Sequence, residues 1–332
     1  MGNPGGPVAT TSEKVTVNPN DPVSPARTLG ISGLQLDKVR NFRRALFNFP
    51  RYNPDMELDD TLMALAEDPT EPVDIAELAL AIAEDEYPDM ITGEYLSRLD
   101  SLAEELAPRI SLADSLEDRV LALTEFLFDD EKFKGNRPQY YDARNSYLND
   151  VLDRRLGIPI TLSVLAMTVG QRAGLDVYGV GLPGHFVAKA VDEDTGEEVI
   201  FDPFHRGRIL TPVMCEGLVT AVTGEPFEAT PDALQPCPPG FIAHRILNNL
   251  KGIYLRQPDY PRAARVMERL LQLDPGDPTQ RRDLGVTLVH AGRPGKALSH
   301  LKAYLDAEPQ AEDFGTVQGF LKDAKKELAK WN

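Results

Sequence analysis

The chain has 332 residues and carries 35 Lys and Arg against 52 Asp and Glu, a net charge of −17. Nucleic acid is bound through basic side chains that displace its counterions, so this balance argues against a nucleic-acid partner. The two cysteines, Cys215 and Cys237, form no C-x-x-C pattern, and no run approaches the roughly 18 apolar residues of a membrane span. We therefore expect a cytoplasmic protein without disulfides, membrane contact or any cofactor, long enough for two or three modules.

The N-terminal third divides into a tail and an acidic helical region. Residues 1–33 are rich in Pro, Gly, Ser and Thr without apolar periodicity, which predicts a disordered tail. Residues 34–135 show apolar positions at helical spacing, which predicts four or five amphipathic helices ending near Asp130, with Pro108 among their boundaries. Between Asp55 and Asp118 there are 20 acidic and 2 basic residues. They form either solvated helix faces or a docking surface for a basic partner.

Residues 136–235 are predicted to form the core module, beginning with two helices. The first covers Asn145 to Leu156, with Asn145 and Ser146 as capping residues. The second runs from Ile160 to Ala173, with Pro159 in its first turn, where the missing N–H costs nothing. Gly174 is expected to end this helix.

After the second helix the pattern changes to short β-rich runs, which predict a small antiparallel sheet over 176–182, 185–191 and 199–204. If 193–196 form the hairpin loop, Val187 pairs with Asp202 and His185 becomes its diagonal neighbour on the same face. A carboxylate bonded to one ring nitrogen orients the other toward a nucleophile. His185 and Asp202 are therefore a candidate base and orienting carboxylate.

The C-terminal part, residues 241–332, contains an internal repeat. Three sets of residues recur at 33 or 34 positions: Gly252 and Gly285, Ala263 and Ala297, Pro275 and Pro309. This is tetratricopeptide spacing, although the consensus Trp is absent and a generic pair of helical hairpins stays open. Such units stack into a concave surface that binds peptides or neighbouring domains.

Three further patterns are set aside. Gly179-x-Gly181-x-x-Gly184 matches a dinucleotide motif, but a strand follows it where a helix N-terminus is required. The histidines have no metal-ligand spacing, and His205 is expected in an exposed turn, so no metal is implied. Cys215 falls in a predicted helix with no residue to orient it as a nucleophile.

The segments 145–163, 182–186 and 201–204 resemble the SirB-type transglutaminase-like proteins. In that group a helical N-terminal region precedes a degenerate transglutaminase core and tetratricopeptide repeats, so the resemblance covers about Leu34 to the end and implies an α+β fold. It also implies that His185 and Asp202 stand at the transglutaminase histidine and aspartate. The nucleophilic cysteine falls on Pro159, which has no nucleophile.

Two hydroxyls on the same helix could replace the cysteine. Ser163 lies one turn further along, roughly 6 Å deeper at 1.5 Å per residue, and is otherwise expected to bond back to a carbonyl. Thr161 lies about 200° around the helix from Pro159. The candidate site thus contains His185, Asp202 and Ser163 as catalytic remnants or hypothetical catalysts. Asn145, Pro159, Thr161 and Gly184 would line a binding cleft.

Two functions from different classes follow. The first is a non-catalytic scaffold or regulator that binds a protein or peptide in the former active-site cleft or on the repeat surface. Proteins with this core also occur fused to an F-box, which implies recognition by analogy. The second is an unorthodox hydrolase or acyltransferase that uses Ser163 or Thr161 with His185 and Asp202.

Overall fold

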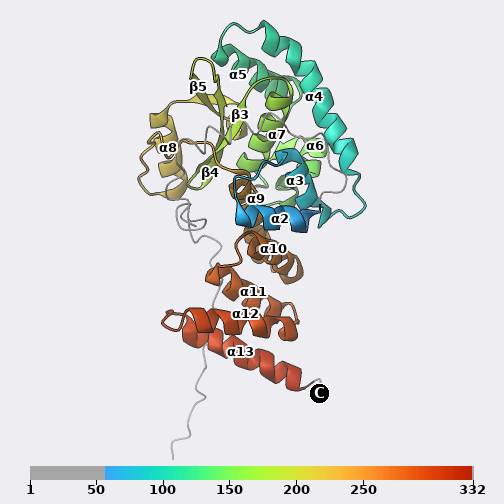
Figure 1. Ribbon diagram of the computed structural model, residues 1–332, viewed down its shortest axis with the longest axis vertical. Coiled ribbons are helices and arrows are strands. Elements are labelled where there is room, and N and C mark those ends of the chain that lie inside the picture. The colour runs from blue at the N-terminus through green and yellow to red at the C-terminus, as the bar shows by residue number, and fades with distance from the viewer. Residues whose placement is uncertain (1–56, 331–332) are drawn as a thin grey trace, which may run out of the picture.

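The computed structural model describes residues 57–330, and its fold is α+β (Figure 1). The predicted tail, residues 1–33, lies outside this range. A helical domain with a small sheet occupies one end, and a stack of helices extends from it toward the C-terminus (Figure 1). None of the helices in the described range has the length and apolar character needed to cross a membrane.

Residues 34–56 of the acidic region lie outside the described range, and its described part forms the helices that the periodicity predicts. They are α2 (Leu58–Glu67), α3 (Ile75–Glu84), α4 (Thr92–Leu112) and α5 (Leu116–Thr124), followed by a π-helical turn, η2 (Glu125–Asp130). Ser115 caps α5 by accepting the Asp118 N–H at 3.1 Å. The expectation that Pro108 ends a helix is wrong, because Pro108 lies inside α4.

The core module begins with a 3-10 turn, η3 (Ala143–Asn145), followed by α6 (Leu148–Arg154) and α7 (Pro159–Arg172). The predicted helix start at Asn145 is therefore three residues early. Between these elements, β2 (Leu156–Gly157) pairs in parallel with β1 (Lys134–Gly135), which the sequence did not indicate. Helix α7 begins at Pro159 and is buried over most of its length, so it is the central helix of the domain.

A four-stranded antiparallel sheet packs beside α7, in the order β3 (Val177–Leu182), β4 (His185–Val191), β5 (Glu198–Asp202) and β6 (Arg208–Leu210). Ala188 pairs with Phe201 and Val191 with Glu198, so the predicted hairpin register is confirmed. The third strand ends at Asp202 instead of Phe204, because Pro203 opens a 3-10 turn, η4 (Pro203–His205). Strand β6 was not predicted.

The two faces of the sheet belong to different apolar clusters. Phe186, Ala188 and Phe201 join the main core with α7. Alternate residues on the other face, with Val187 and Ile200 among them, pack in a smaller cluster under α8 (Pro212–Thr223), which contributes the buried Cys215.

The C-terminal stack consists of five helices: α9 (Pro239–Arg256), α10 (Tyr260–Leu273), α11 (Pro278–His290), α12 (Pro294–Ala307) and α13 (Phe314–Ala329). The repeated Ala263 and Ala297 are both fully buried. An added Cβ at Gly285 would lie 2.7 Å from Leu301, so glycine allows close packing between helices there, whereas its repeat partner Gly252 has open space around the same position. Helix α9 also contacts α2, α3 and α7 and joins the stack to the core.

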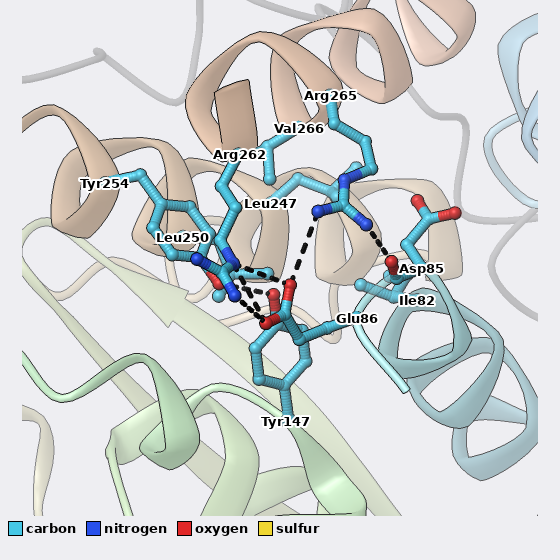
Figure 2. Close-up of a pocket in the computed structure, with 10 residues that line it drawn as sticks. All are labelled: Ile82, Asp85, Glu86, Tyr147, Leu247, Leu250, Tyr254, Arg262, Arg265 and Val266. Carbon is cyan, nitrogen blue, oxygen red and sulfur yellow. Dashed lines mark hydrogen bonds and ion pairs between the residues drawn. The ribbon is translucent and has the colours of Figure 1, made fainter. Parts of the chain in front are cut away.

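Arginines of α10 meet carboxylates of the acidic helical region at this junction. Arg262 donates to Glu86 through its Nε and Nη2 atoms, with separations of 2.7–2.9 Å, and Arg265 bonds to Asp85 (Figure 2). Arg269 also donates to Asp85. The small hollow beside these pairs has a volume of about 10 Å³, room for one water at most. Part of the acidic surface is thus neutralised by basic residues of the same chain.

Candidate functional site

His185 and Asp202 form a buried hydrogen-bonded pair. The His185 Nε2 atom lies 2.9 Å from Asp202 Oδ2, and the side chains are 5% and 1% exposed. The histidine opens β4 and the aspartate closes β5, so the antiparallel register brings together residues 17 positions apart. This is the proximity that the sequence predicted.

Asp202 has a second imidazole partner that the sequence analysis missed. His205 Nδ1 lies 2.7 Å from Asp202 Oδ2, and the ring is only 32% exposed, so the expected exposed turn at His205 is wrong. Asp202 caps the 3-10 turn by accepting the N–H groups of Phe204 and His205. The turn brings the side chain of His205, three residues after Asp202, back to the same carboxylate. An Asp-Pro pair followed by His two residues after the proline is the sequence signal for this arrangement.

The two imidazoles determine the electrostatics of the carboxylate. Burial alone would raise the pKa of Asp202, but hydrogen bonds from His185 and His205 and their charges outweigh it and hold that pKa below its usual value. An ionised Asp202 is therefore well suited to orient His185.

The same three side chains offer two nitrogens and one oxygen within 4.8 Å of one another, a donor set that zinc accepts. Their geometry fits a hydrogen-bonded network equally well, because both ring nitrogens already lie at bonding distance from the single oxygen Asp202 Oδ2. The sequence indicated no metal-ligand spacing because His205 comes close only through the cap.

The start of α7 offers His185 no hydroxyl among the described contacts. Pro159 is buried at the first helical position. Thr161 Oγ1 donates to Asn145 O at 2.7 Å and accepts the Ile158 N–H at 3.1 Å. This hydroxyl therefore stabilises the main chain just before α7 and is not directed at His185. Ser163 is fully buried, and in the described part of the chain its Oγ has no partner, contrary to the expected bond to a carbonyl.

The remaining predicted cleft residues have structural contacts. Asn145 does not cap α6: its amide donates to the carbonyls of Gln139 and Tyr140 and accepts from Asn136. The N-cap of α6 is Tyr147, without a side-chain bond, so the capping prediction for Asn145 and Ser146 is wrong.

Gly184 forms the tight turn between β3 and β4, with a φ of +69°, and a Cβ there would lie 2.7 Å from Val222 of α8. The dinucleotide motif therefore ends in a strand-to-strand turn, as expected.

Residue alternation places His185 and Asp202 on the α8 side of the sheet. Leu182 pairs with His185, and the β4–β5 register extended by one residue sets Val187 opposite Asp202; both apolar residues belong to that cluster. Cys215 lies in the same cluster, and burial together with the Asp202 charge raises the pKa of its thiol. A hollow of about 510 Å³ opens further along this face, and Lys189 and Leu234 are among its lining residues.

Comparison with known proteins gives two family models. The transglutaminase-like superfamily matches residues 93–248 and the tetratricopeptide repeat matches residues 250–321. No solved structure matches the chain.

Among curated relatives, a UPF0162 protein of Xylella fastidiosa (strain Temecula1) is 35% identical over 80% of this chain and 94% of its own. A UPF0162 protein of Vibrio cholerae is 30% identical over 50% of this chain and 61% of its own. F-box only protein 21 of Mus musculus is 40% identical over 31% of this chain and 18% of its own. The chain belongs to the UPF0162 family of SirB-type proteins, which join a transglutaminase-like core to C-terminal tetratricopeptide repeats.

Proposed function

We propose that this protein is a non-catalytic scaffold or regulator that binds a peptide or protein partner beside His185 or on the helical repeats. One observation carries the proposal: the His185–Asp202 pair is intact and buried, while the helix start that would supply the nucleophile is Pro159. Proline offers neither a thiol nor a hydroxyl to attack a carbonyl carbon.

The geometry of the possible substitutes supports a binding role. Thr161 uses its hydroxyl on Asn145 O and Ile158 N, and Ser163 is fully buried. Cys215 is also fully buried with a raised thiol pKa, whereas a nucleophilic cysteine needs a lowered one. Activating any of these three groups would require rearrangement of the core.

The domain organisation belongs to the same proposal. An acidic helical region (34–135) and a core (136–235) present the site, and repeats at 241–332 supply a second surface for a partner. The likeness to a protein named for an F-box supports recognition as the role, by analogy. Two free cysteines fit a reducing cytoplasm.

A capture experiment on the full chain tests the proposal. A synthetic random hexapeptide library, half with free C-termini and half amidated, is passed over immobilised protein, and bound peptides are identified by mass spectrometry. We expect a distinct set of peptides whose affinity falls about tenfold or more in His185→Ala, as for a central contact residue. Asp194→Ala, at an exposed position in the turn between β4 and β5 and outside both proposed surfaces, is the control and should bind as the wild type does.

The same peptides then report on catalysis. Incubation overnight with the full chain should leave them intact, without cleavage or acyl transfer to added amines. Turnover that scales with protein concentration and disappears in Ser163→Ala would establish the hydrolase or acyltransferase alternative. Failure to capture any peptide set would overturn the binding role.

A further inference from the structure

Arg245, on α9, is a partly buried arginine that contacts the candidate site. Its Nη2 donates to the main-chain oxygen of His185 at 3.1 Å, so the guanidinium lies directly beside the candidate site. Over residues 57–330 no carboxylate forms an ion pair with it. A guanidinium has five N–H donors, so most of its hydrogen-bonding capacity is unused by the described contacts.

The surroundings do not compensate this positive charge. Burial lowers the pKa of Arg245, and the groups that act on it electrostatically are Tyr140 and Cys237, both neutral at pH 7. A guanidinium that is largely withdrawn from water and has no carboxylate partner is energetically unfavourable. An anion from outside the chain would remove this cost.

Further donors lie around the same point. Tyr140 is partly buried, and none of the described residues hydrogen-bonds to its hydroxyl, although Arg245 acts on it electrostatically. The Tyr140 ring packs edge-on against Phe204 at 6.0 Å, and the His185 ring does the same at 6.1 Å. The exposed Arg137 guanidinium lies over the Phe204 ring at 5.9 Å, with no ion pair in the described range.

Arg137, Tyr140, Phe204 and Arg245 thus form a contiguous cluster of cationic and aromatic groups, which we name the Arg245 cluster. Among residues 57–330, neither guanidinium has a carboxylate partner and the Tyr140 hydroxyl has no hydrogen bond, on a chain with a net charge of −17. By contrast, Arg262 and Arg269 of the neighbouring helix are fully engaged by carboxylates. Unpaired donors against this acidic background indicate a site for an anionic ligand.

We propose that the Arg245 cluster binds the C-terminal carboxylate of a peptide beside His185. Two parallel N–H groups of a guanidinium match the two oxygens of a carboxylate, and a hydroxyl such as that of Tyr140 adds a third donor. A chain end brings its charge on a terminal group that can enter a partly buried position, whereas a continuing chain would have to pass it. The buried Phe204 ring packs against Tyr140 and lies beneath Arg137, so it would hold these donors in place around the carboxylate.

This inference rests on the proposed peptide-binding function, and the hexapeptide library tests the two separately. On the full wild-type chain, free-acid peptides should be captured about tenfold more than their amidated counterparts. Arg245→Gln should reduce that ratio to about one, and Tyr140→Phe should reduce it about threefold, in line with losing a charged and a neutral hydrogen bond. Arg206→Gln, an exposed arginine paired with Asp129, is the control and should keep the wild-type ratio.

The possible outcomes distinguish the Arg245 site from peptide binding in general. Equal capture of acid and amide peptides, or an unchanged preference in Arg245→Gln, would overturn the Arg245 site while leaving peptide binding intact. Capture of nothing would overturn the proposed function itself. Folding is checked by thermal denaturation: ligand-free Arg245→Gln should melt at or above the wild-type temperature, since the variant removes an uncompensated charge. If that variant fails to fold, Tyr140→Phe still decides the question through the acid-to-amide ratio.

Discussion

At the scale of single residues, Asp202 is the centre of the candidate site. One carboxylate oxygen lies at bonding distance from His185 and His205, and the other accepts the main-chain N–H groups of Phe204 and His205. A buried carboxylate with this many partners is held in one orientation and in its ionised form. The network therefore stabilises the fold whether or not the site performs chemistry.

Asp202→Asn should change how stability depends on pH. The folded pKa of Asp202 lies below its ordinary value of 3.8, so its contribution is present above pH 3.8 and is lost as the pH falls through the folded pKa. We expect the variant to lose about 1–3 kcal/mol at pH 7, and this deficit should shrink in acid below about pH 4. Urea denaturation at pH 7, 5 and 3 measures it. A deficit that is constant with pH would contradict the assignment.

Removing the hydroxyl should change the stability of the fold differently at Ser163 and at Thr161. Ser163→Ala removes a buried polar atom without a described partner, so we expect stability within about 0.5 kcal/mol of wild type, or a gain of up to about 2. Thr161→Val removes the bonds to Asn145 O and Ile158 N and should cost about 1–3 kcal/mol. Chemical denaturation compares the pair. A large loss in Ser163→Ala would reveal a partner for that hydroxyl.

The sequence could predict the His185–Asp202 contact because a four-residue loop fixes hairpin register and register fixes faces. His205 and Arg245 were missed for different reasons. His205 depends on a side-chain cap that turns the chain after Asp202. Arg245 comes from a helix 60 positions away, and its unpaired state is a property of three-dimensional packing that no local pattern encodes.

At the scale of elements, periodicity predicted the long helices and the three longer strands, but not the two-residue strands or β6. Short strands bury too few side chains to show alternation, and β6 follows Arg206 and Gly207, whose positive φ angles turn the chain back beside β5. Asn145 was predicted to cap a helix because asparagine is a preferred N-cap residue. In the fold its amide holds the 139–140 segment instead.

Asp176, just before β3, lies close enough to the acidic β4–β5 turn for its ionisation to be affected by the charges there. Burial, then the charges of Glu193 and Asp192, raise the pKa of Asp176 to about 6. A raised pKa gives stability below pH 3.8 that is lost as the pH rises through about 6. Asp176→Asn should therefore be more stable than wild type at pH 7 by about 1–2 kcal/mol, less than the full shift implies because the carboxyl is partly exposed.

The pH profile provides the check on that expectation. The advantage of Asp176→Asn should become small near pH 3.5, where the wild-type carboxyl is mostly protonated in both the folded and the unfolded chain. Asp194→Asn removes an exposed charge from the same turn and serves as the control. An advantage of equal size at pH 3.5 and pH 7 would show that the effect does not come from ionisation of Asp176.

At the scale of the whole molecule, the acidic helices and the repeat stack are connected by ion pairs across long sequence separations. Arg262 and Glu86 are 176 positions apart, and Arg269 reaches Asp85 across 184. The hydrogen bonds that Arg262 donates to Glu86 and Asp259 raise the pKa of its guanidinium, so the cation is firmly held. We infer that these contacts fix the orientation of α10 against α3 and so help to position the repeat surface relative to the site.

A double-mutant cycle on Glu86→Gln and Arg262→Gln measures this connection. The Glu86 side chain is only 16% exposed and accepts from two nitrogens of Arg262, so we expect a coupling energy of about 1–2 kcal/mol for this pair. The control cycle uses Arg98 and Asp153, a pair at 2.5 Å whose side chains are 43% and 48% exposed, and should give below about 1 kcal/mol. In 1 M salt the control coupling should fall further toward zero, because screening acts most on exposed charges. Equal couplings at low salt, or equal losses in high salt, would mean that the Glu86 pair is an ordinary surface contact and does not orient the repeats.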